Sequence, residues 1–209
     1  MFFSPCPAMN ISFLAVMSIH TPVTATGIYF ITFTCHQWLQ LIELVKGYDL
    51  FYKWFDILSV NGHTVTGYVI MPNHLHLLLY YVWNGKSLNT IIGNGKRFMA
   101  YDIIDRLESR KEERMLARLR SGVWASDSKR GKKHEVWKDS FDVKQCRTEK
   151  FVLQKLNYIH NNPCAGKWKL ADSIIHYPHS SALFYMNGKI GNYPVKDYRE
   201  LLSPDNYED

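Results

Sequence analysis

The stretch TVTGYVIMPNHLHLLLYYV at residues 64–82 decides the fold of this chain. Its opening part, TVTGYVI at 64–70, and its closing part, HLHLLLYYV at 74–82, are rich in β-branched, aromatic and aliphatic residues, which predicts two strands. The short MPN segment between them fits a tight connection. We therefore expect the two strands to pair as an antiparallel hairpin.

Two more segments are typical of strands, and one further segment is typical of a helix. GIYFITFTC at 27–35 is rich in β-branched and aromatic residues and has no polar helical face, so it predicts a strand. VWKDSFDV at 136–143 predicts a further strand or a sheet edge. Apolar residues at helical spacing over 39–59 predict one helix, kinked or delayed in its start at Gly47.

Two further helices are predicted later in the chain. Ser87 is the expected N-cap of a helix that runs to about Arg120 and becomes increasingly charged. Thr148 is the expected cap of the last helix, which Pro163 ends. The polar and basic run SDSKRGKK at 126–133, between these helices, is expected to be a mobile loop.

The predicted order of elements indicates the fold class. Strand, helix, strand, strand, helix, strand is the order of the ferredoxin-like fold, an α+β architecture with a four-stranded antiparallel sheet and two helices on one face. The helix over 148–162 is then an addition, free to pack against the other face or the edge of the sheet. We expect one domain at 23–186, a disordered or dispensable N-terminal extension at 1–22, and a C-terminal tail at 187–209.

The composition fits one globular domain with a polyanionic partner. The 209 residues are 46% hydrophobic and 14% aromatic, and 25 Lys and Arg against 19 Asp and Glu give a net charge of +6. Basic side chains attract phosphates and rings can stack on nucleobases, although core packing is the commoner use of rings. Four scattered cysteines fit a reducing cytoplasm, and no segment reaches the roughly 18 apolar residues of a membrane span. We therefore expect a cytoplasmic protein.

Two histidines in the second hairpin strand form the first candidate site. Alternate side chains of a strand share a face, so His74 and His76 point the same way, roughly 7 Å apart along the backbone. Imidazoles at this separation can bind one divalent metal ion. Taken alone, the pair is also compatible with an amphipathic strand whose polar face carries two histidines.

The last predicted helix carries the second candidate site. Tyr158 and Asn162 are four residues apart and share a helical face. An amide oxygen suits Mg²⁺ or Mn²⁺, and a phenol can attack phosphorus. Alone, these residues also fit a helix end that Asn162 caps and Tyr158 packs against. Together with the two histidines they supply the groups that metal-assisted phosphoryl transfer to tyrosine requires.

The two motifs, in this order, resemble those of a known protein family. MPNHLH at 71–76 is similar to the HUH signature of single-tyrosine transposases. KLNYIHNNPCAGKW at 155–168 resembles the tyrosine helix of the REP-associated tyrosine transposases, whose core is ferredoxin-like. The resemblance runs from about residue 27 to residue 185 and includes three shorter segments, GKRF at 95–98, WKDSFD at 137–142 and YPHSSA at 177–182.

The resemblance implies a site and a substrate. Tyr158 would be the nucleophile that forms a 5′-phosphotyrosine link, and His74, His76 and Asn162 would bind Mg²⁺ or Mn²⁺. The substrate would be single-stranded or hairpin DNA, cleaved and rejoined during transposition, in the cytoplasm at the nucleoid. A homodimer is compatible with the family, in which some members share the tyrosine helix between subunits.

Four basic residues are candidate DNA contacts. The family resemblance points to Lys96 and Arg97, in the second predicted helix. Lys132 and Lys133 belong to the basic run at 126–133, for which a solvated loop is the alternative interpretation.

Two other functions are compatible with the sequence. A host DNA-binding protein of the same fold would bind DNA without transposing it. An unrelated phosphoesterase would use the two histidines to bind zinc, but it would need further ligands in a recognisable group. The remaining histidines considered for this role show no such spacing: His36, His63, His160 and His176.

Overall fold

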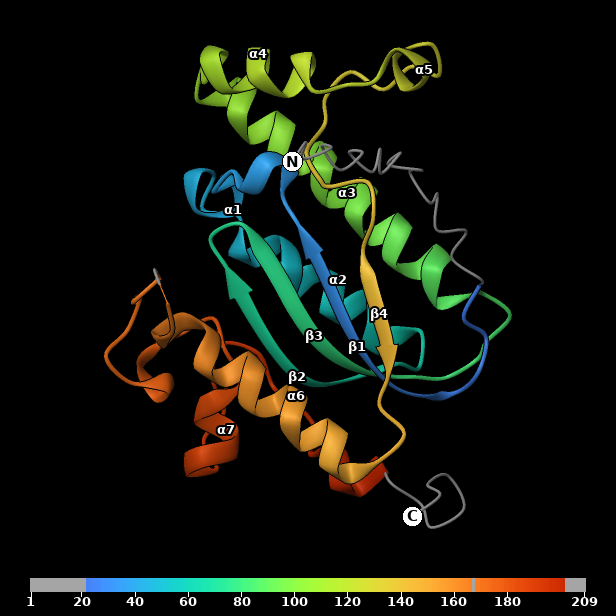
Figure 1. The fold of residues 1–209 in the computed structure, drawn as a ribbon, viewed down its shortest axis with the longest axis vertical. Helices are drawn as coiled ribbons and strands as arrows, with labels where there is room; N and C mark the ends of the chain where they lie inside the picture. The colour runs from blue at the N-terminus through green and yellow to red at the C-terminus, as the bar shows by residue number, and fades with distance from the viewer. Residues whose placement is uncertain (1–21, 167, 202–209) are drawn as a thin grey trace, which may run out of the picture.

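Four strands form one antiparallel sheet in the computed structural model, which describes residues 22–166 and 168–201. The strand order is β2-β3-β1-β4 (Figure 1). The strands are β1 (Gly27–Thr34), β2 (Thr64–Met71), β3 (His74–Tyr81) and β4 (Asp142–Gln145). This is the strand order of the ferredoxin-like fold, so the predicted α+β fold class is confirmed. Nearly all of the predicted extension at 1–22 lies outside the described residues.

The predicted hairpin is the centre of the sheet. Met71 lies opposite His74, so the chain reverses within the two residues between them, as expected from the MPN segment. β3 pairs with β2 on one side and with β1 on the other, which makes it a central strand with both faces buried. Any side chain on β3 is therefore fixed by neighbours on two strands.

The fourth strand lies later in the chain than predicted. The sequence indicated 136–143, whereas β4 is Asp142–Gln145 and pairs with residues 29–32 in the middle of β1. Trp137 makes only an isolated bridge with Cys35. Lys138, Asp139 and Ser140, which follow Trp137, are polar and exposed, so this stretch gains little by pairing and leaves the sheet edge.

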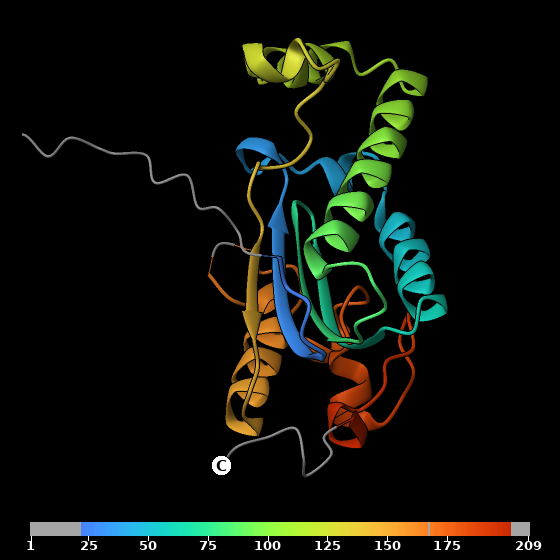
Figure 2. The same cartoon turned by 90° about the vertical axis from the view of Figure 1, so that its right-hand side faces the viewer.

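Helices α2 (Tyr48–Val60) and α3 (Leu88–Ser109) cover one face of the sheet (Figures 1 and 2). Ser87 caps α3 as predicted, because its hydroxyl accepts a hydrogen bond from the backbone N–H of Thr90. Most of the core lies in this layer. Its largest fully buried aromatic and aliphatic side chains include Phe33, Phe51, Phe55, Tyr68, Ile31 and Leu41.

Both predicted helices are divided in two: the first at the kink or delayed start expected at Gly47, directly before α2, and the second where no break was expected. The helix expected over 39–59 is α1 (Leu41–Leu44) followed by α2, and the second is α3 followed by α4 (Glu113–Ser121). Lys46 and Lys111 adopt left-handed backbone at the two breaks, with φ of 52° and 57°. After each one, a backbone N–H donates back five residues and closes the preceding helix: Gly47 to Ile42, and Glu112 to Leu107.

Helix α6 (Glu149–Asn161) packs against the opposite face of the sheet (Figure 2). Thr148 caps it as predicted, by accepting from the N–H of Phe151. Its apolar residues form a second, smaller core with Ile28, Phe30, Val69, Met71 and Leu78 of the sheet. At Gly67 an added Cβ would press on the Leu156 side chain, so a small residue in β2 permits the close approach of α6.

The remaining elements are short. They are η1 (His36–Trp38), α5 (Ala125–Ser128), η2 (Asn162–Cys164), η3 (Ile174–His176), α7 (Ala182–Asn187) and η4 (Tyr198–Leu201). Helix α5 occupies part of the run at 126–133 that was predicted as a loop. Both α4 and α5 lie beyond one end of the sheet (Figure 1). Within the described ranges, no helix combines the length and apolar character that crossing a bilayer requires.

Candidate active site

The two histidines of β3 lie on the face of the sheet that α6 covers. Their neighbours Leu75 and Leu77 point into the main core, because side chains alternate along a strand. His74 and His76 are both buried, and their ring centroids are 4.7 Å apart. The two histidines thus point to the same face of the sheet, as predicted from strand alternation.

Two hydrogen bonds fix how these rings face the site. The Asn73 amide nitrogen donates to the Trp38 carbonyl at 2.8 Å, so the Asn73 carbonyl oxygen accepts from His74 Nδ1, 2.6 Å away. This tautomer leaves the Nε2 of His74 with a free lone pair. His76 Nδ1 lies 2.7 Å from the Thr32 hydroxyl, in the strand position directly opposite. Such partners on the far ring nitrogen are typical of metal-binding histidines.

Burial keeps both histidines neutral at neutral pH. It lowers the pKa of His74 to about 4, an effect that the neighbouring Asn162 side chain partly offsets. Burial likewise lowers the pKa of His76 to about 3, with smaller contributions from His74 and the Lys155 ammonium. A neutral imidazole is the form that binds a metal ion.

Helix α6 brings the other two predicted residues to the same place. The Tyr158 ring is half exposed, and its centroid lies 5.0 Å from that of His76 and 6.1 Å from that of Phe30. Asn162 follows one turn later, where α6 passes into η2. All four predicted residues therefore line one groove.

The donor set fits a small divalent cation. Among the described residues, the Nε2 of His76 and the Oδ1 of Asn162 are buried and have no hydrogen-bond partner. Leaving such atoms unpaired is costly, so their presence in a groove indicates that a ligand satisfies them. Two imidazole nitrogens with one amide oxygen suit Mn²⁺ or Mg²⁺, with water or phosphate oxygens completing the shell.

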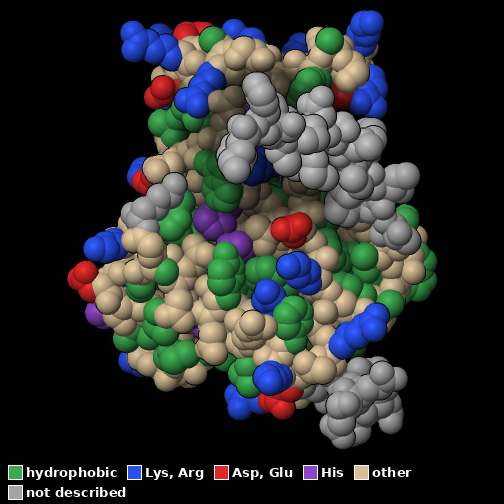
Figure 3. Space-filling view, in the orientation of Figure 1, with side chains coloured by type: hydrophobic (Ala, Val, Ile, Leu, Met, Phe, Trp, Pro, Cys, Tyr) green, Lys and Arg blue, Asp and Glu red, His purple; other side chains and the backbone are tan. Residues whose placement is uncertain are grey.

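The groove around these residues has a volume of about 790 Å³. Its walls carry the cations of Lys138, Lys144 and Lys155 and the rings of Trp38 and Trp168. Figure 3 shows histidine side chains near the centre of this face, with hydrophobic and basic side chains around them. A groove that combines cations and rings suits a charged polymer with planar groups.

Sequence reasoning missed several residues that touch the site. Thr32 and Asn73 orient the histidines, and both could have been identified from the sequence. Asn73 directly precedes His74, and pairing β1 with β3 places Thr32 opposite His76. Lys155 lies one turn before Tyr158, with its ammonium 4.9 Å from the Phe30 ring. Trp38 had no signal in the sequence, because its position depends on the turn after β1.

The four basic candidates lie outside this groove, along a second cavity of about 850 Å³ between α3 and the segment at 130–141. Lys96 is buried, donates to the Lys138 carbonyl at 3.0 Å, and has a pKa that burial lowers to about 8. Arg97 is exposed and lies over the Phe98 ring. The second cavity adjoins the first, because Lys138 and Phe141 line both.

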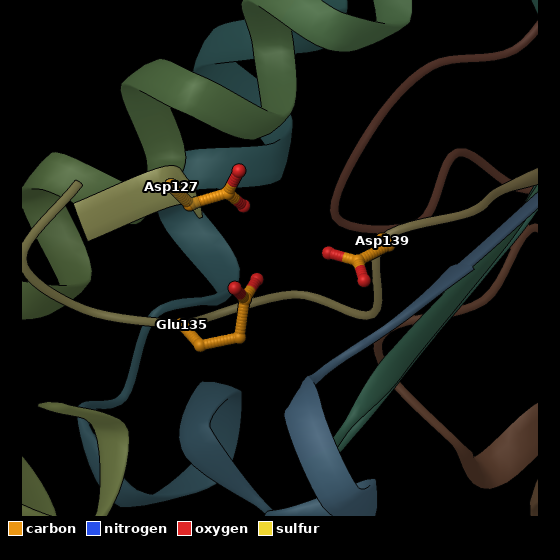
Figure 4. A group of neighbouring side chains, drawn as sticks. All are labelled: Asp127, Glu135 and Asp139. Atoms are coloured by element: carbon orange, nitrogen blue, oxygen red, sulfur yellow. The ribbon is translucent and has the colours of Figure 1, made fainter. Parts of the chain in front are cut away.

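Lys132 lies within an acidic cluster, whereas Lys133 is exposed. The cluster is made of Asp127, Glu135 and Asp139 (Figure 4). The Lys132 ammonium is 2.5 Å from Glu135, 3.4 Å from Asp127 and 3.9 Å from Asp139. In the described part of the chain this is the only group of three His, Cys, Asp or Glu side chains close enough to hold a metal ion, and an ammonium already offsets its charge.

The structure combines a ferredoxin-like sheet, two histidines on its central strand β3, and a tyrosine on the helix that packs across that face. The structure of a REP-associated tyrosine transposase bound to a REP hairpin matches this chain with a TM-score of 0.58 and 15% identity. The match covers 92% of this chain and 98% of that chain. It confirms the predicted resemblance at the level of the fold.

A second solved structure is a candidate transposase from Deinococcus radiodurans R1. It has 20% identity and a TM-score of 0.31, covering 66% of this chain and 91% of that chain, and is too distant to add to the comparison. No protein-family model matches the chain, and no curated protein does.

Proposed function

We propose that this protein is a transposase that cleaves and rejoins single-stranded DNA through a covalent link to Tyr158. The observation that carries the proposal is the position of the Tyr158 ring beside His76, next to two buried ligand atoms without partners. A nucleophile and a set of metal-binding atoms in one groove are what metal-assisted phosphoryl transfer needs. The exposure of Tyr158 leaves its phenol accessible to a phosphate.

The proposed reaction exchanges one phosphoester for another. The Tyr158 oxygen attacks the scissile phosphorus, and the bond from phosphorus to the 3′ oxygen breaks. The phenol loses its proton, and the departing 3′ oxygen takes one up, so the products are a 5′-phosphotyrosine and a free 3′-OH. Rejoining is the reverse reaction with the same or another 3′-OH, and it requires no nucleotide cofactor because one ester replaces another.

His74, His76 and Asn162 would hold a Mg²⁺ or Mn²⁺ ion at this site. A bound divalent ion would polarise the scissile phosphate and offset the charge that develops on its oxygens. The chain's own contribution is to keep both imidazoles neutral and oriented through Thr32 and Asn73. The acidic cluster near α5 is no competing candidate, since Lys132 lies among its carboxylates.

Single-stranded or hairpin DNA is the proposed substrate. The protein of similar fold is bound to a REP hairpin, and the groove here combines three lysines with exposed rings. A net charge of +6 supports binding to a polyanion. Arg97 and Lys133 are proposed to contact the backbone, since both are exposed. Lys96 and Lys132 are weaker candidates because other groups of the chain already hold their ammonium groups.

The decisive experiment is a covalent-adduct assay. The protein is incubated with Mn²⁺ and labelled hairpins that carry unpaired flanks, taken from the DNA around its own gene. We expect an adduct that survives denaturation, and its loss in Tyr158→Phe with hairpin binding unchanged. Tyr101→Phe is the matched control, because Tyr101 is also exposed but lies on α3, along the second cavity.

Two results would count against the proposal. An undiminished adduct in Tyr158→Phe would assign the nucleophile to another of the 13 tyrosines. Tight hairpin binding without any adduct under all metal conditions would favour a host DNA-binding protein of the same fold.

A further inference from the structure

Trp38 lines the groove, and packing of the core does not explain the position of its ring. It is the last residue of η1, directly after β1. Its side chain is 52% exposed, although a tryptophan is usually well buried. The ring centroid lies 6.0 Å from that of His74, at an interplanar angle of 77°. A large apolar ring is therefore held in solvent beside a candidate metal ligand.

The backbone at this position is in an unfavourable conformation. Gln37 and Trp38 both have positive φ, 49° and 58°, which bulky residues other than glycine rarely adopt. The surroundings impose it: Arg118 donates twice to the Gln37 side chain, and the Asn73 amide donates to the Trp38 carbonyl. Strain of this kind is concentrated at functional sites.

Asn73 links the ring position to the candidate metal site. One end of its amide holds the Trp38 carbonyl at 2.8 Å, and the other end fixes the His74 ring at 2.6 Å. The Trp38 backbone and the His74 ring are therefore held by the same side chain. A ligand that stacks on Trp38 would lie close to whatever His74 binds, because the two ring centroids are 6.0 Å apart.

A cation accompanies the ring. The Lys138 ammonium lies 4.7 Å from the centre of the Trp38 ring, and Lys138 lines the same groove. Because this ammonium lies over one face of the indole, a base would stack on the opposite face, with a phosphate partner next to it. This is the combination with which proteins bind unpaired nucleotides.

From this geometry we infer that Trp38 and Lys138 form a subsite for one unpaired nucleotide beside the scissile phosphate. Trp38 stacks on the base, and Lys138 pairs with a phosphate of the same strand. Because every base has a π face, the subsite sets the position of the strand and accepts any sequence. This inference rests on the proposed function, since it takes single-stranded DNA as the ligand of the groove.

The test is a mutant cycle between the protein and the DNA. Binding of hairpins with unpaired flanks is measured in a Tyr158→Phe background, with a single abasic site moved through each unpaired position. The protein variant is Trp38→Asn, because asparagine tolerates left-handed backbone and its small amide side chain has no ring on which a base could stack. We expect one abasic position and Trp38→Asn each to weaken binding by about 5- to 150-fold, and their combination to cost no more than either alone.

Two further variants complete the experiment. Trp38→Phe keeps a stacking ring and should restore most of the affinity and the dependence on that abasic position. Trp83→Leu is the matched control, because Trp83 is 46% exposed but lies in the connection between β3 and α3, outside the groove lining. Its effect should be small and additive with every abasic position.

The outcomes separate this inference from the proposed function. Additive losses at all positions, or unchanged affinity in Trp38→Asn with a native circular dichroism spectrum, would overturn the subsite even if wild type forms the adduct. Non-additive losses at one position would support the subsite even if no adduct forms, because the binding assay does not depend on chemistry. If Trp38→Asn does not fold, Lys138→Met and a scan of neutral phosphate analogues replace it, and additive losses there would also overturn the subsite.

Discussion

Thr32 and His76 illustrate how single residues could be tested at the candidate metal site. His76→Ala removes a proposed ligand, so Mn²⁺-dependent cleavage should fall by orders of magnitude. Thr32→Val keeps the shape and removes the hydroxyl that lies 2.7 Å from His76 Nδ1, so metal affinity should fall about 10- to 100-fold. Cleavage is measured as a function of Mn²⁺ concentration, and excess metal should rescue Thr32→Val but not His76→Ala.

Asn162→Ala should reduce Mn²⁺-dependent cleavage less than His76→Ala does, because a water molecule can replace one oxygen ligand. Full cleavage by the wild type in excess EDTA would show that His74, His76 and Asn162 have no metal role.

Buried histidines also predict how the fold responds to acid. Burial lowers the pKa of His160 to about 4, and its Nε2 lies 2.9 Å from the Ser181 hydroxyl. The unfolded chain takes up this proton near pH 6.5, whereas the folded chain does so only near pH 4. Stability contributed by the neutral ring is therefore complete above pH 6.5 and is lost as the pH falls from 6.5 to about 4. His74 and His76 act in the same direction.

The measurement is urea unfolding between pH 7.5 and 5, above the range in which carboxylates titrate. In wild type the free energy of unfolding should decrease as the pH falls. His160→Gln should make this decrease shallower by up to about 1.4 kcal/mol per pH unit, which is the effect of one proton. His176→Gln, at an exposed position, is the control for loss of an imidazole. Parallel slopes for wild type and His160→Gln would contradict the prediction.

The sequence was sufficient to group the four site residues but not to judge individual lysines. Strand alternation put His74 and His76 on one face, and helical spacing did the same for Tyr158 and Asn162. Whether a lysine faces solvent depends on contacts from distant segments. Lys132 is held by three acids that come from both sides of it in the chain.

At the scale of elements, two glycines of α3 provide a matched test of how the helix layer packs. An added Cβ at Gly95 would overlap the Trp54 ring of α2, whereas at Gly93 it would meet open space. Gly95→Ala should therefore destabilise the protein by about 1–3 kcal/mol through overpacking. Gly93→Ala should stabilise it by about 0.5–1 kcal/mol, because alanine has the higher helix propensity.

Urea unfolding measures both variants. Equal effects of the two alanines would show that Trp54 does not restrict α3. This packing also gives GKRF at 95–98 a structural role, since Gly95 admits Trp54 and Lys96 is buried beside it.

The helix breaks mark the limit of prediction at this scale. The predicted element order is correct, but the chain turns at Lys46 after α1 and at Lys111 after α3, and in both breaks the left-handed residue is a lysine. Glycine or asparagine is the usual signal for such an end. Gly47 gave that signal for the first break, which was predicted as a kink or delayed start, whereas neither residue type marks the break at Lys111. β4 starts later than predicted because the exposed polar residues Lys138, Asp139 and Ser140 leave the sheet edge before it, although β1 itself continues to Thr34.

At the scale of the whole molecule, the position of the tyrosine helix limits the substrate. Helix α6 crosses one sheet face with one Tyr158 and one histidine pair, so under the proposed function each chain would cut one strand. The groove lysines would contact phosphates, while rings such as Trp38 need bases that are not paired. Tight binding should thus require unpaired nucleotides, and plain duplex of the same sequence should bind weakly.

A gel-shift titration at two salt concentrations would test this expectation. Hairpins with single-stranded flanks should bind more tightly than the matched duplex at both concentrations. Their affinity should fall steeply with salt, with a log–log slope of roughly −0.7 for each phosphate contacted in a single strand. Lys138→Met should reduce that slope by about one contact, because its ammonium is exposed in the groove, whereas Lys96→Met should not, because the Lys96 ammonium is buried against the Lys138 carbonyl. Equal affinity for duplex and hairpin would contradict a single-strand substrate, since the rings of the groove would then contribute nothing to binding.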